Sequence, residues 1–512
     1  LVSSIDDYLT VKVYLSGENL PAGLRKLKES TRFLLEEFRA YGGTNVQYEF
    51  IDPNEISNTR ERRDFQKQLN SLGLSPVTLS IREDDQATDM VIYPGAVVYY
   101  KNRNTPVQLL EQQLGRTDQE VIEQSILNLE YKFSNAIRKL DVDSMAKSIA
   151  FIQGHGELNS NQTESFKKEL EQYYKVRSIN LPKFKVGALD NFDLAIIAKP
   201  AESFTELEKY KIDQYLMKGG KLIYLVDPLI ASMDSLEKLG GTSLTADYPL
   251  NIDDQLFKYG VRINRNLVQD MQNHMIGVIK NGRPSFAPWP YFPLVVPDIE
   301  HPISSNLSDI WFRFVSSIDT VAAAGIKKTP LLKSSEYSRL LYHPVRITLQ
   351  QSREKMNERL YNKGPQTLAV LLEGEFESLY KNRISPETKS SGKYGTPLEK
   401  SPFTQCIVIS DGDLIRNEYN PMRDAFLPLG YDPKSRQTFA NMDFLLNCVD
   451  YLLDDSGILT LRSKDYQIRL LNKAKASSEA SKWKIINMAL PSIIILLFGF
   501  VFNFIRARKY ST

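Results

Sequence analysis

Residues 148–158 read SIAFIQGHGEL, a short apolar run that ends in two glycines, a histidine and a glutamate. Three further apolar runs are of similar length: FDLAIIA at 192–198, KLIYLV at 221–226 and QCIVIS at 405–410. Such runs, separated by helical segments such as 205–218, are typical of strands that are buried on both faces of a parallel sheet. The sequence therefore predicts an α/β domain with a doubly wound parallel sheet over residues 146–462.

The third and fourth runs are separated by roughly 180 residues, far more than a connecting loop in a compact domain needs. We therefore expect an inserted subdomain over about residues 243–400. It contains APWPYFP at 287–293, which places Trp289, Tyr291 and Phe292 on a backbone stiffened by prolines. Two interpretations stay open. These aromatic side chains form an exposed, preorganised contact for a partner protein or a glycan, or they are buried and roof the insertion.

The first 145 residues alternate strand and helix patterns in the order βαβ and then ββα. Strand patterns occur at 11–16, 46–52 and 95–100, and a helical pattern over 21–41 is followed by two glycines. This is the order of a thioredoxin-like fold. The loop after the first strand reads GENLPAGL and has no cysteine, which excludes thiol–disulfide chemistry there. We expect a thioredoxin-like domain over residues 1–145 without the redox residues.

The C-terminal region contains the longest uncharged segment. Residues 485–505 read IINMALPSIIILLFGFVFNFI, and as a helix these 21 residues would measure about 31 Å, which matches the hydrocarbon core of a bilayer. We predict a transmembrane helix over 485–505, a juxtamembrane segment over 463–484 and a tail over 506–512. Basic residues flank both ends of the segment, so charge alone does not orient it.

Composition excludes several classes of protein. The 64 basic and 62 acidic residues of the 512-residue chain give a net charge of +2, without the positive excess of a nucleic-acid binder. With two cysteines, Cys406 and Cys448, the chain has neither a disulfide scaffold nor a cysteine-rich zinc site. The sequence contains no phosphate-binding GxxxxGK[ST] loop, no HExxH and no GxSxG, and its four histidines are scattered. We expect no cofactor and no metal.

The strongest candidate for site chemistry is the turn after the first apolar run, with Gly154, His155, Gly156 and Glu157. Ligands of open α/β sheets bind at the carboxyl ends of strands, where glycines let the backbone approach and a histidine or glutamate can act as general base. The alternative is a strand-end turn whose glycines supply unusual backbone angles. The fold is similar to that of glutamine amidotransferases, but neither cysteine lies at the strand-to-helix turn where such an enzyme needs its nucleophile.

Carboxylates also follow two other predicted strands. Asp411 and Asp413 come after the run at 405–410, and Asp227 follows the run at 221–226. Carboxylates at one sheet edge could hold a divalent cation or contact a ligand, but a polar turn that caps the next helix is the more common role of such residues.

Five stretches occur together in a distinctive order: PWPYFPL at 288–294, HPISSNLSDIWFRFVSSID at 301–319, LAVLLEGEFESLYKNR at 368–383, IVISDGDLIRN at 407–417 and FLLNCVDYLLDDSGILTLRSK at 444–464. In these motifs the chain closely resembles the gliding-motility-associated ABC transporter auxiliary proteins of Bacteroidetes, called GldG. The resemblance extends over nearly the whole chain. It implies an inner-membrane protein with its main body in the periplasm and its C-terminus in the cytoplasm. The implied partners are a separate permease, a separate ATPase and the gliding machinery.

The resemblance implies no catalytic residues, and family members carry an N-terminal membrane helix that we expect to precede Leu1. The leading hypothesis is therefore a non-enzymatic auxiliary subunit whose domains act as binding surfaces. Two alternatives stay open: a membrane-anchored hydrolase that uses the residues around His155 and Asp411, and a receptor for a glycan or another solute.

Overall fold

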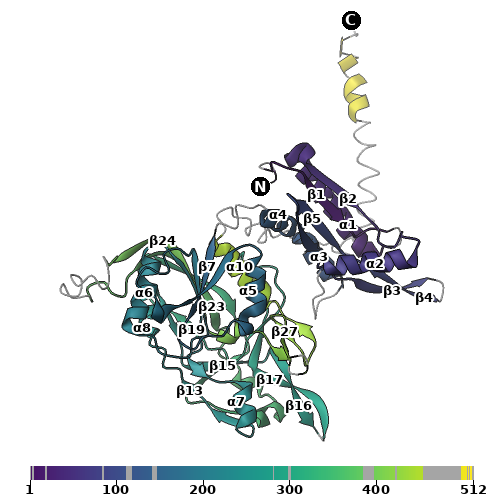
Figure 1. The fold of residues 1–512 in the computed structure, drawn as a ribbon. Helices are drawn as coiled ribbons and strands as arrows, with labels where there is room; N and C mark the ends of the chain where they lie inside the picture. Colours follow the sequence, from purple (N-terminus) through teal and green to yellow (C-terminus); the bar gives the residue numbers. More distant parts are fainter. Residues whose placement is uncertain are drawn as a thin grey trace. The chain divides into compact units, whose positions relative to one another are not determined.

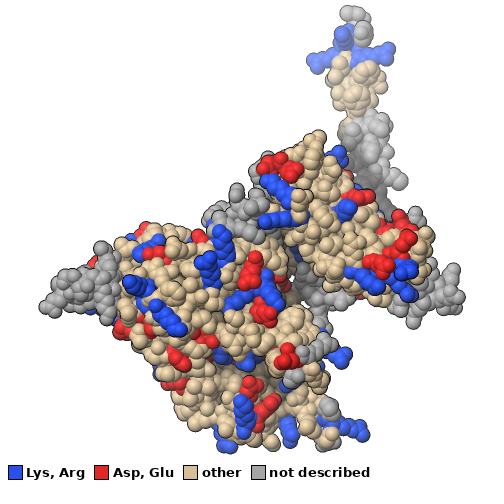
Figure 2. Space-filling model, viewed as in Figure 1, with Lys and Arg blue, Asp and Glu red and all other residues tan. Residues whose placement is uncertain are grey.

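The computed structural model describes most of the chain, and the account below is confined to those residues. They are 2, 5–17, 20–83, 86–110, 118–140, 147–280, 282–297, 301–383, 397–420, 422, 424–453, 497–503, 505–506 and 508–509. Residues 1–464 form one compact unit and residues 465–512 a second. Figure 1 shows the elements, and the view in Figure 2 has basic and acidic side chains interspersed over the surface, as the near-neutral net charge predicts.

The second unit is described only at its end, where residues 497–503 are helical and largely exposed. Among the described residues, no helix is both long enough and apolar enough to cross a membrane. The predicted span over 485–505 lies mostly outside the described residues, as does the whole juxtamembrane segment over 463–484. Both stay predictions.

The N-terminal region is built on a four-stranded sheet in the order β2-β1-β5-β6, in which β1 is parallel to β2 and antiparallel to β5. The strands are β1 (Leu9–Val13), β2 (Val46–Phe50), β5 (Gly95–Tyr100) and β6 (Arg103–Gln108), and β3 (Val77–Glu83) and β4 (Gln86–Ile92) form a separate hairpin. The helices are α1 (Ala22–Gly42), α2 (Thr59–Ser71), α3 (Asp118–Leu127) and α4 (Leu129–Leu140). This connectivity has the expected βαβ and ββα order, with the β3–β4 hairpin added.

The second region contains a seven-stranded sheet in the order β20-β23-β24-β10-β9-β7-β8. Its strands are β7 (Ser148–Gln153), β8 (Lys175–Asn180), β9 (Leu194–Ala198), β10 (Lys221–Leu225), β20 (Ile326–Lys333), β23 (Thr367–Glu377) and β24 (Lys400–Ile409). The pairs from β8 through β24 are parallel. All four apolar runs of the sequence are therefore neighbouring parallel strands, as predicted, but the sheet as a whole is mixed.

Helices cover both faces of this sheet (Figure 1). On one face α5 (Glu164–Glu171) and α10 (Asn441–Leu453) contribute Phe166 and Phe444 to a core with Ile149 and Ile407 of the strands. On the other face α6 (Glu206–Met217) and α8 (Asp253–Tyr259) pack against alternate strand residues such as Tyr224. Because successive strand side chains point to opposite faces, a sheet covered on both sides needs continuous apolar strands.

The expected boundary of the insertion is wrong in one respect. Strands β20 and β23 lie within residues 243–400, yet both belong to the main sheet, where β23 is antiparallel to β24 and to β20. Every residue from 368 to 374 is buried. A strand with no solvated face is stable only when both of its faces are covered. As part of the main sheet, β23 lies between the two cores that cover the faces of that sheet.

The remaining elements form a smaller layer of strands, and part of that layer surrounds a second, aromatic-rich core. Its strands are β11 (Leu229–Ile230), β12 (Thr242–Leu244), β13 (Ala246–Asp247), β14 (Val261–Ile263), β15 (Asn266–Asp270), β16 (Asn273–Lys280), β17 (Arg283–Val295), β18 (Ile310–Trp311), β19 (Ile318–Thr320), β21 (Ser338–Tyr342), β22 (Arg346–Thr348), β25 (Tyr419–Asn420), β26 (Ala425–Phe426), β27 (Tyr431–Asp432) and β28 (Gln437–Thr438), with helix α7 (Met233–Lys238). Trp289 and Tyr291 are fully buried in this core.

Candidate functional site

The parallel strands end at one edge of the sheet, and the polar residues that follow them meet there. His155 follows β7, Lys199 follows β9, Asp227 follows β10, and Asp411 follows β24. The sequence predicted this edge as the candidate site because ligands of open α/β sheets bind there. The structure resolves it into two separate groups of contacts, one around His155 and one around Lys199.

His155 is buried and held on both sides of its ring. Its Nδ1 lies 3.1 Å from Oε1 of Glu157, and its Nε2 lies 3.2 Å from Oε2 of Glu208. The ring stacks on Phe204 at a centroid distance of 3.7 Å. Burial lowers the pKa of His155, but its hydrogen bonds to Glu157 and Glu208 outweigh that effect and raise the pKa above its usual value.

The partners of His155 are themselves engaged in holding local structure. The Glu157 carboxylate accepts a hydrogen bond of 2.7 Å from the backbone N–H of His155. Glu208 forms a capping box with Thr205 at the start of α6, so its carboxylate is fixed by the helix. Gly154 and Gly156 have φ of 119° and 71°, which favour glycine. The group therefore matches the predicted strand-end turn.

Three carboxylates meet around one ammonium group. Oxygens of Asp227, Asp411 and Asp413 lie within 4.8 Å of one another, and all three residues are buried. The Nζ of Lys199 lies 2.8 Å from Oδ2 of Asp227 and 2.6 Å from Oδ2 of Asp413. Two carboxylates thus have the ammonium of Lys199 where a metal site would hold its cation.

Backbone groups satisfy the other carboxylate oxygens. Asp227 accepts a 2.7 Å hydrogen bond from the N–H of Gly412. Asp411 accepts 2.7 Å bonds from the N–H groups of Asp413 and Arg313. These bonds connect the ends of β10 and β24 to the segment after β18, so the cluster ties distant parts of the chain together.

The pKa values of the three carboxyl groups are shifted in different directions. Burial raises the pKa of Asp413, but Lys199, Arg313 and Arg416 outweigh that effect and lower it to about 2. Burial, together with the neighbouring carboxylates, raises the pKa of Asp411 and of Asp227, the latter despite the opposing effect of Lys199. The pKa of Lys199 is raised by Asp227 and Asp413 against the effect of burial. The cationic neighbours therefore shift the pKa of Asp413 downward, in the opposite direction to the pKa values of Asp227 and Asp411.

A cavity of about 500 Å³ lies beside this cluster and is lined by both aromatic and charged side chains. Phe292, Trp311 and Phe314 contribute aromatic surface. The guanidinium of Arg313 lies 4.2 Å from the ring centroid of Trp311 and pairs with the carboxylate of Glu418. A small solute could contact an aromatic wall and charged groups here.

The three aromatic residues of the 287–293 run are not an exposed surface. Trp289 and Tyr291 are fully buried and Phe292 is 4% exposed, with all three in the second core. Of the two interpretations, the structure supports the buried one. Residues 289 to 293 are all buried, so this part of β17 is covered on both faces.

Sequence analysis missed Lys199, Arg313 and Trp311. Lys199 directly follows the apolar run at 192–198, in the position that singled out Asp227 and Asp411, so the same rule applied to basic residues would have found it. Arg313 and Trp311 carry no comparable signal, because β18 has only two residues and joins the site through tertiary contacts.

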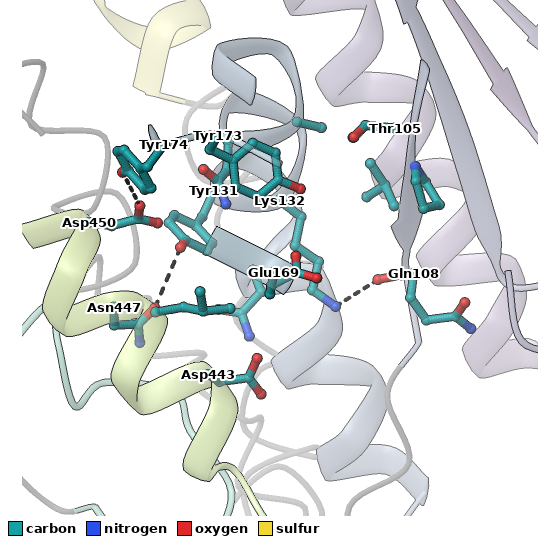
Figure 3. A pocket seen from close by; sticks show the side chains of 16 residues that line it. Thr105, Gln108, Tyr131, Lys132, Glu169, Tyr173, Tyr174, Asp443, Asn447 and Asp450 are labelled. Atoms are coloured by element: carbon teal, nitrogen blue, oxygen red, sulfur yellow. Dashed lines mark hydrogen bonds between the residues drawn. The ribbon is translucent and has the colours of Figure 1, made fainter. Parts of the chain in front are cut away.

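A smaller cavity of about 210 Å³ lies among residues of β6, α4, α5 and α10 (Figure 3). Polar side chains that line it bond to one another: Tyr174 donates to Asp450 at 2.9 Å, and Tyr131 lies 3.5 Å from Asn447. Lys132 donates to the carbonyl of Gln108 at 2.7 Å. These bonds hold the elements around the cavity.

Comparisons with solved structures add little about this fold. The N-terminal domain of mmIFT52 is 16% identical, with 60% of this chain and 99% of that chain covered, at a TM-score of 0.35. The exo-β-1,4-mannosidase Op5Man5 from Opitutaceae bacterium strain TAV5 is 9% identical, with 57% and 35% covered, at a TM-score of 0.18. Both scores are too low to support an argument. No curated protein matches the chain.

Family models are more informative. A domain of unknown function (DUF7088) matches residues 1–99. A second model, ABC_transp_aux, described as an ABC-type uncharacterized transport system, matches residues 146–448. That match extends from the start of the seven-stranded sheet into α10, so it includes the strand-end cluster and the aromatic-rich layer. Because it covers more than half of the 512 residues, the chain belongs to this family of ABC-type transport-system auxiliary proteins.

Proposed function

We propose that this chain is a non-catalytic auxiliary subunit of an inner-membrane ABC transporter complex that gliding motility requires. Its family membership supports the link to transport. The resemblance to GldG in five ordered motifs supports the narrower assignment to gliding. The partners would be a permease subunit and a separate ATPase subunit, since the sequence has no loop for ATP phosphates.

The observation that best supports a non-catalytic role is the occupation of the strand-end cluster by Lys199. Its ammonium contacts two of the three carboxylates, and backbone N–H groups take up other oxygens. A general base needs a lone pair that can reach a substrate proton. His155 is likewise held between Glu157 and Glu208. In both groups the polar side chains make contacts within the protein, as residues with a structural role do.

The proposed location is the inner membrane, with the main body in the periplasm and the C-terminus in the cytoplasm. The uncharged segment 485–505 would anchor the chain, and Arg506, Arg508 and Lys509 would lie on the cytoplasmic side. The thioredoxin-like and amidotransferase-like domains would then serve as binding surfaces for partner proteins.

Affinity purification from detergent-solubilised membranes tests this proposal. The expected result is co-purification of a permease and an ATPase in fixed proportion, whereas recovery of the chain alone would contradict the subunit assignment. A His155→Ala/Glu157→Ala variant serves as the test of site chemistry. Gliding that is lost although the complex still assembles would favour a hydrolase or a ligand-dependent role over a scaffold.

The cavity beside Trp311 favours one alternative, a receptor for a small solute. Its volume of about 500 Å³ is within the usual range of ligand pockets. A screen of glycans and other solutes by thermal denaturation separates the two functions. A ligand whose stabilising effect disappears in a Trp311→Ala variant would support the receptor, and a screen without any shift would favour the scaffold.

A further inference from the structure

The hairpin of β16 and β17 has one buried face and one exposed apolar face. Its inner side chains, among them Ile276 and Trp289, belong to the second core. Its outer side chains Met275, Ile279 and Phe286 are 54%, 68% and 52% exposed. Single exposed apolar residues are ordinary, but three on one face of one hairpin form a patch that calls for an explanation.

The strand register places these residues together. Met275 pairs with Pro288 and Gly277 pairs with Phe286, so Phe286 lies diagonally between Met275 and Ile279 across the two strands. Side chains on one face of an antiparallel pair contact their directly opposite and diagonal neighbours. The patch therefore extends along the hairpin toward its end, which Figure 1 shows at the lower edge of the body.

Basic side chains lie close to this patch, and its two strands carry no acidic residue. Residues 271–297 contain no aspartate or glutamate. Arg283, at the start of β17, is exposed. Arg353 is exposed and donates a 3.3 Å hydrogen bond to the carbonyl of Ile279. The stem of Lys434 lies over Gly277, with its Cδ 3.6 Å from the place that a Cβ would occupy.

Acidic side chains also lie at one end of the patch. Asp234 and Glu237 line the large cavity together with Met275 and Ile276. None of the residues that line that cavity comes from 279–286. The end of the hairpin thus combines exposed apolar side chains with basic ones.

We propose that this face of the β16–β17 hairpin docks on an anionic phospholipid surface. Apolar side chains enter the interface between headgroups and acyl chains, and flanking arginine and lysine side chains contact lipid phosphates. A protein partner is less favoured by the same residues, because the two strands carry basic side chains and no acidic ones, which suits a layer of anionic headgroups. Strand addition is also disfavoured, since the prolines of β17 lack N–H donors and Arg353 occupies a carbonyl of β16.

The proposal rests on the proposed anchoring of the chain in a membrane. Helix α10 ends at Leu453, and the predicted span begins at residue 485. Because the body and the predicted span belong to one chain, anchoring would keep the hairpin near a bilayer at a raised effective concentration.

A fluorescent label on the hairpin tests this proposal in the full chain. Both native cysteines are fully buried, so a label reacts at an introduced cysteine. Ile279→Cys is the test variant, and Phe33→Cys on α1 is the matched control, because Phe33 is 69% exposed and Ile279 is 68% exposed. Each chain is reconstituted into vesicles of phosphatidylcholine, with or without phosphatidylglycerol, that carry a lipid-attached quencher. Flotation with the vesicles is scored first.

We expect the label at position 279 to lose about half of its fluorescence in anionic vesicles and almost none in zwitterionic ones, while the label at position 33 is unaffected. Adding Lys434→Gln should reduce the docked fraction about fivefold, as the loss of one cationic contact predicts, because the stem of Lys434 lies over Gly277 on the same face.

The other outcomes overturn the proposal in distinguishable ways. A chain that floats without quenching at 279 is anchored but does not dock. Equal quenching in both vesicles contradicts the role of anionic lipid, and quenching at both positions contradicts a specific face. Shielding of 279 only when a permease co-purifies assigns the face to a protein. A chain that floats with neither vesicle type contradicts the proposed anchoring as well, whereas the assignment as a subunit is decided separately by co-purification.

Discussion

The Nζ of Lys199 lies 2.6 Å from Oδ2 of Asp413, and this contact joins the ends of β9 and β24. The same ammonium lies 2.8 Å from Asp227 at the end of β10. Lys199 has a positive φ of 55°, an uncommon conformation for a residue with a Cβ. The contact therefore stabilises an unfavourable backbone conformation at Lys199.

Replacing Lys199 with methionine should destabilise the fold strongly. The side chain keeps its apolar stem, but the buried carboxylates of Asp227 and Asp413 lose their ammonium partner, and breaking a buried pair costs about 3–5 kcal/mol. Urea denaturation at pH 7 measures the change. Lys218→Met is the control, because the exposed pair of Lys218 with Asp190 should contribute at most about 1 kcal/mol. Equal effects of both variants would contradict a structural role for Lys199.

A smaller residue at 199 should convert the cluster into a cation site. In Lys199→Ala, carboxylates within 4.8 Å of one another have room for a hard divalent ion such as Ca²⁺. Calcium at 100 times its dissociation constant would then stabilise the variant by about 2.7 kcal/mol. Thermal denaturation with and without calcium checks this. The double variant Lys199→Ala/Asp413→Asn should respond less, and a calcium response of equal size in the unaltered chain would refute the idea.

Gly412→Ala should loosen the same edge of the sheet. A Cβ at Gly412 would lie 2.5 Å from Cβ and 3.0 Å from Cα of Lys199, and the second of these atoms is backbone. Such overpacking costs about 1–3 kcal/mol. Gly277→Ala is the matched control in a strand, since its nearest neighbour would be the flexible Lys434 at 3.6 Å. Urea midpoints of the two variants that coincide would show that the edge can relax.

His155 and His301 should contribute to the free energy of unfolding with opposite dependence on pH. Glu157 and Glu208 raise the pKa of His155 against the effect of burial, so its contribution is complete below about pH 6.5 and is lost as the pH rises through the folded-state pKa. Burial lowers the pKa of His301, so its contribution is present above about pH 6.5 and is lost as the pH falls.

Urea unfolding of His155→Gln and His301→Gln at several pH values between 5 and 9 tests this pair of signs. The destabilisation by His155→Gln should shrink as the pH rises, and that by His301→Gln should grow. Curves with the same slope for both variants would show that the carboxylates around His155 do not control its proton.

The two cysteines should resist thiol reagents in the folded protein. Cys406 and Cys448 are fully buried, and burial raises the pKa of both thiols. A chromogenic disulfide reagent should therefore report almost no thiol under native conditions and two thiols per chain after denaturation. Rapid native labelling would mean that the sheet opens readily at β24 or that α10 detaches.

Local sequence predicted much of the second region because the signals there are local. The run 148–153 coincides with β7. The segment 205–218 contains α6, which has a capping box at Thr205. Continuous apolar composition indicates burial on both faces, and cap residues mark a helix end, without knowledge of the rest of the chain. The convergence of His155, Asp227 and Asp411 at one edge also followed from strand direction alone.

The rest depended on contacts between residues far apart in the chain. No local pattern predicts that β23 pairs with β24 and so belongs to the main sheet and not to the predicted insertion. Strand pairing depends on two segments that are separate in sequence. The same holds for Arg313, which reaches the cluster from the segment after β18.

The sequence by itself determined where four strands of the main sheet lie, which of their ends are polar, and that the chain lacks a phosphate loop and a cysteine in the loop after its first strand. Those properties depend on composition and short-range periodicity. Tertiary structure decided that Lys199 balances the charges of the cluster, that Trp289 and Tyr291 are buried, and that Met275, Ile279 and Phe286 share an exposed face. Those properties depend on which side of a strand is covered and by what, and only the packed chain sets that.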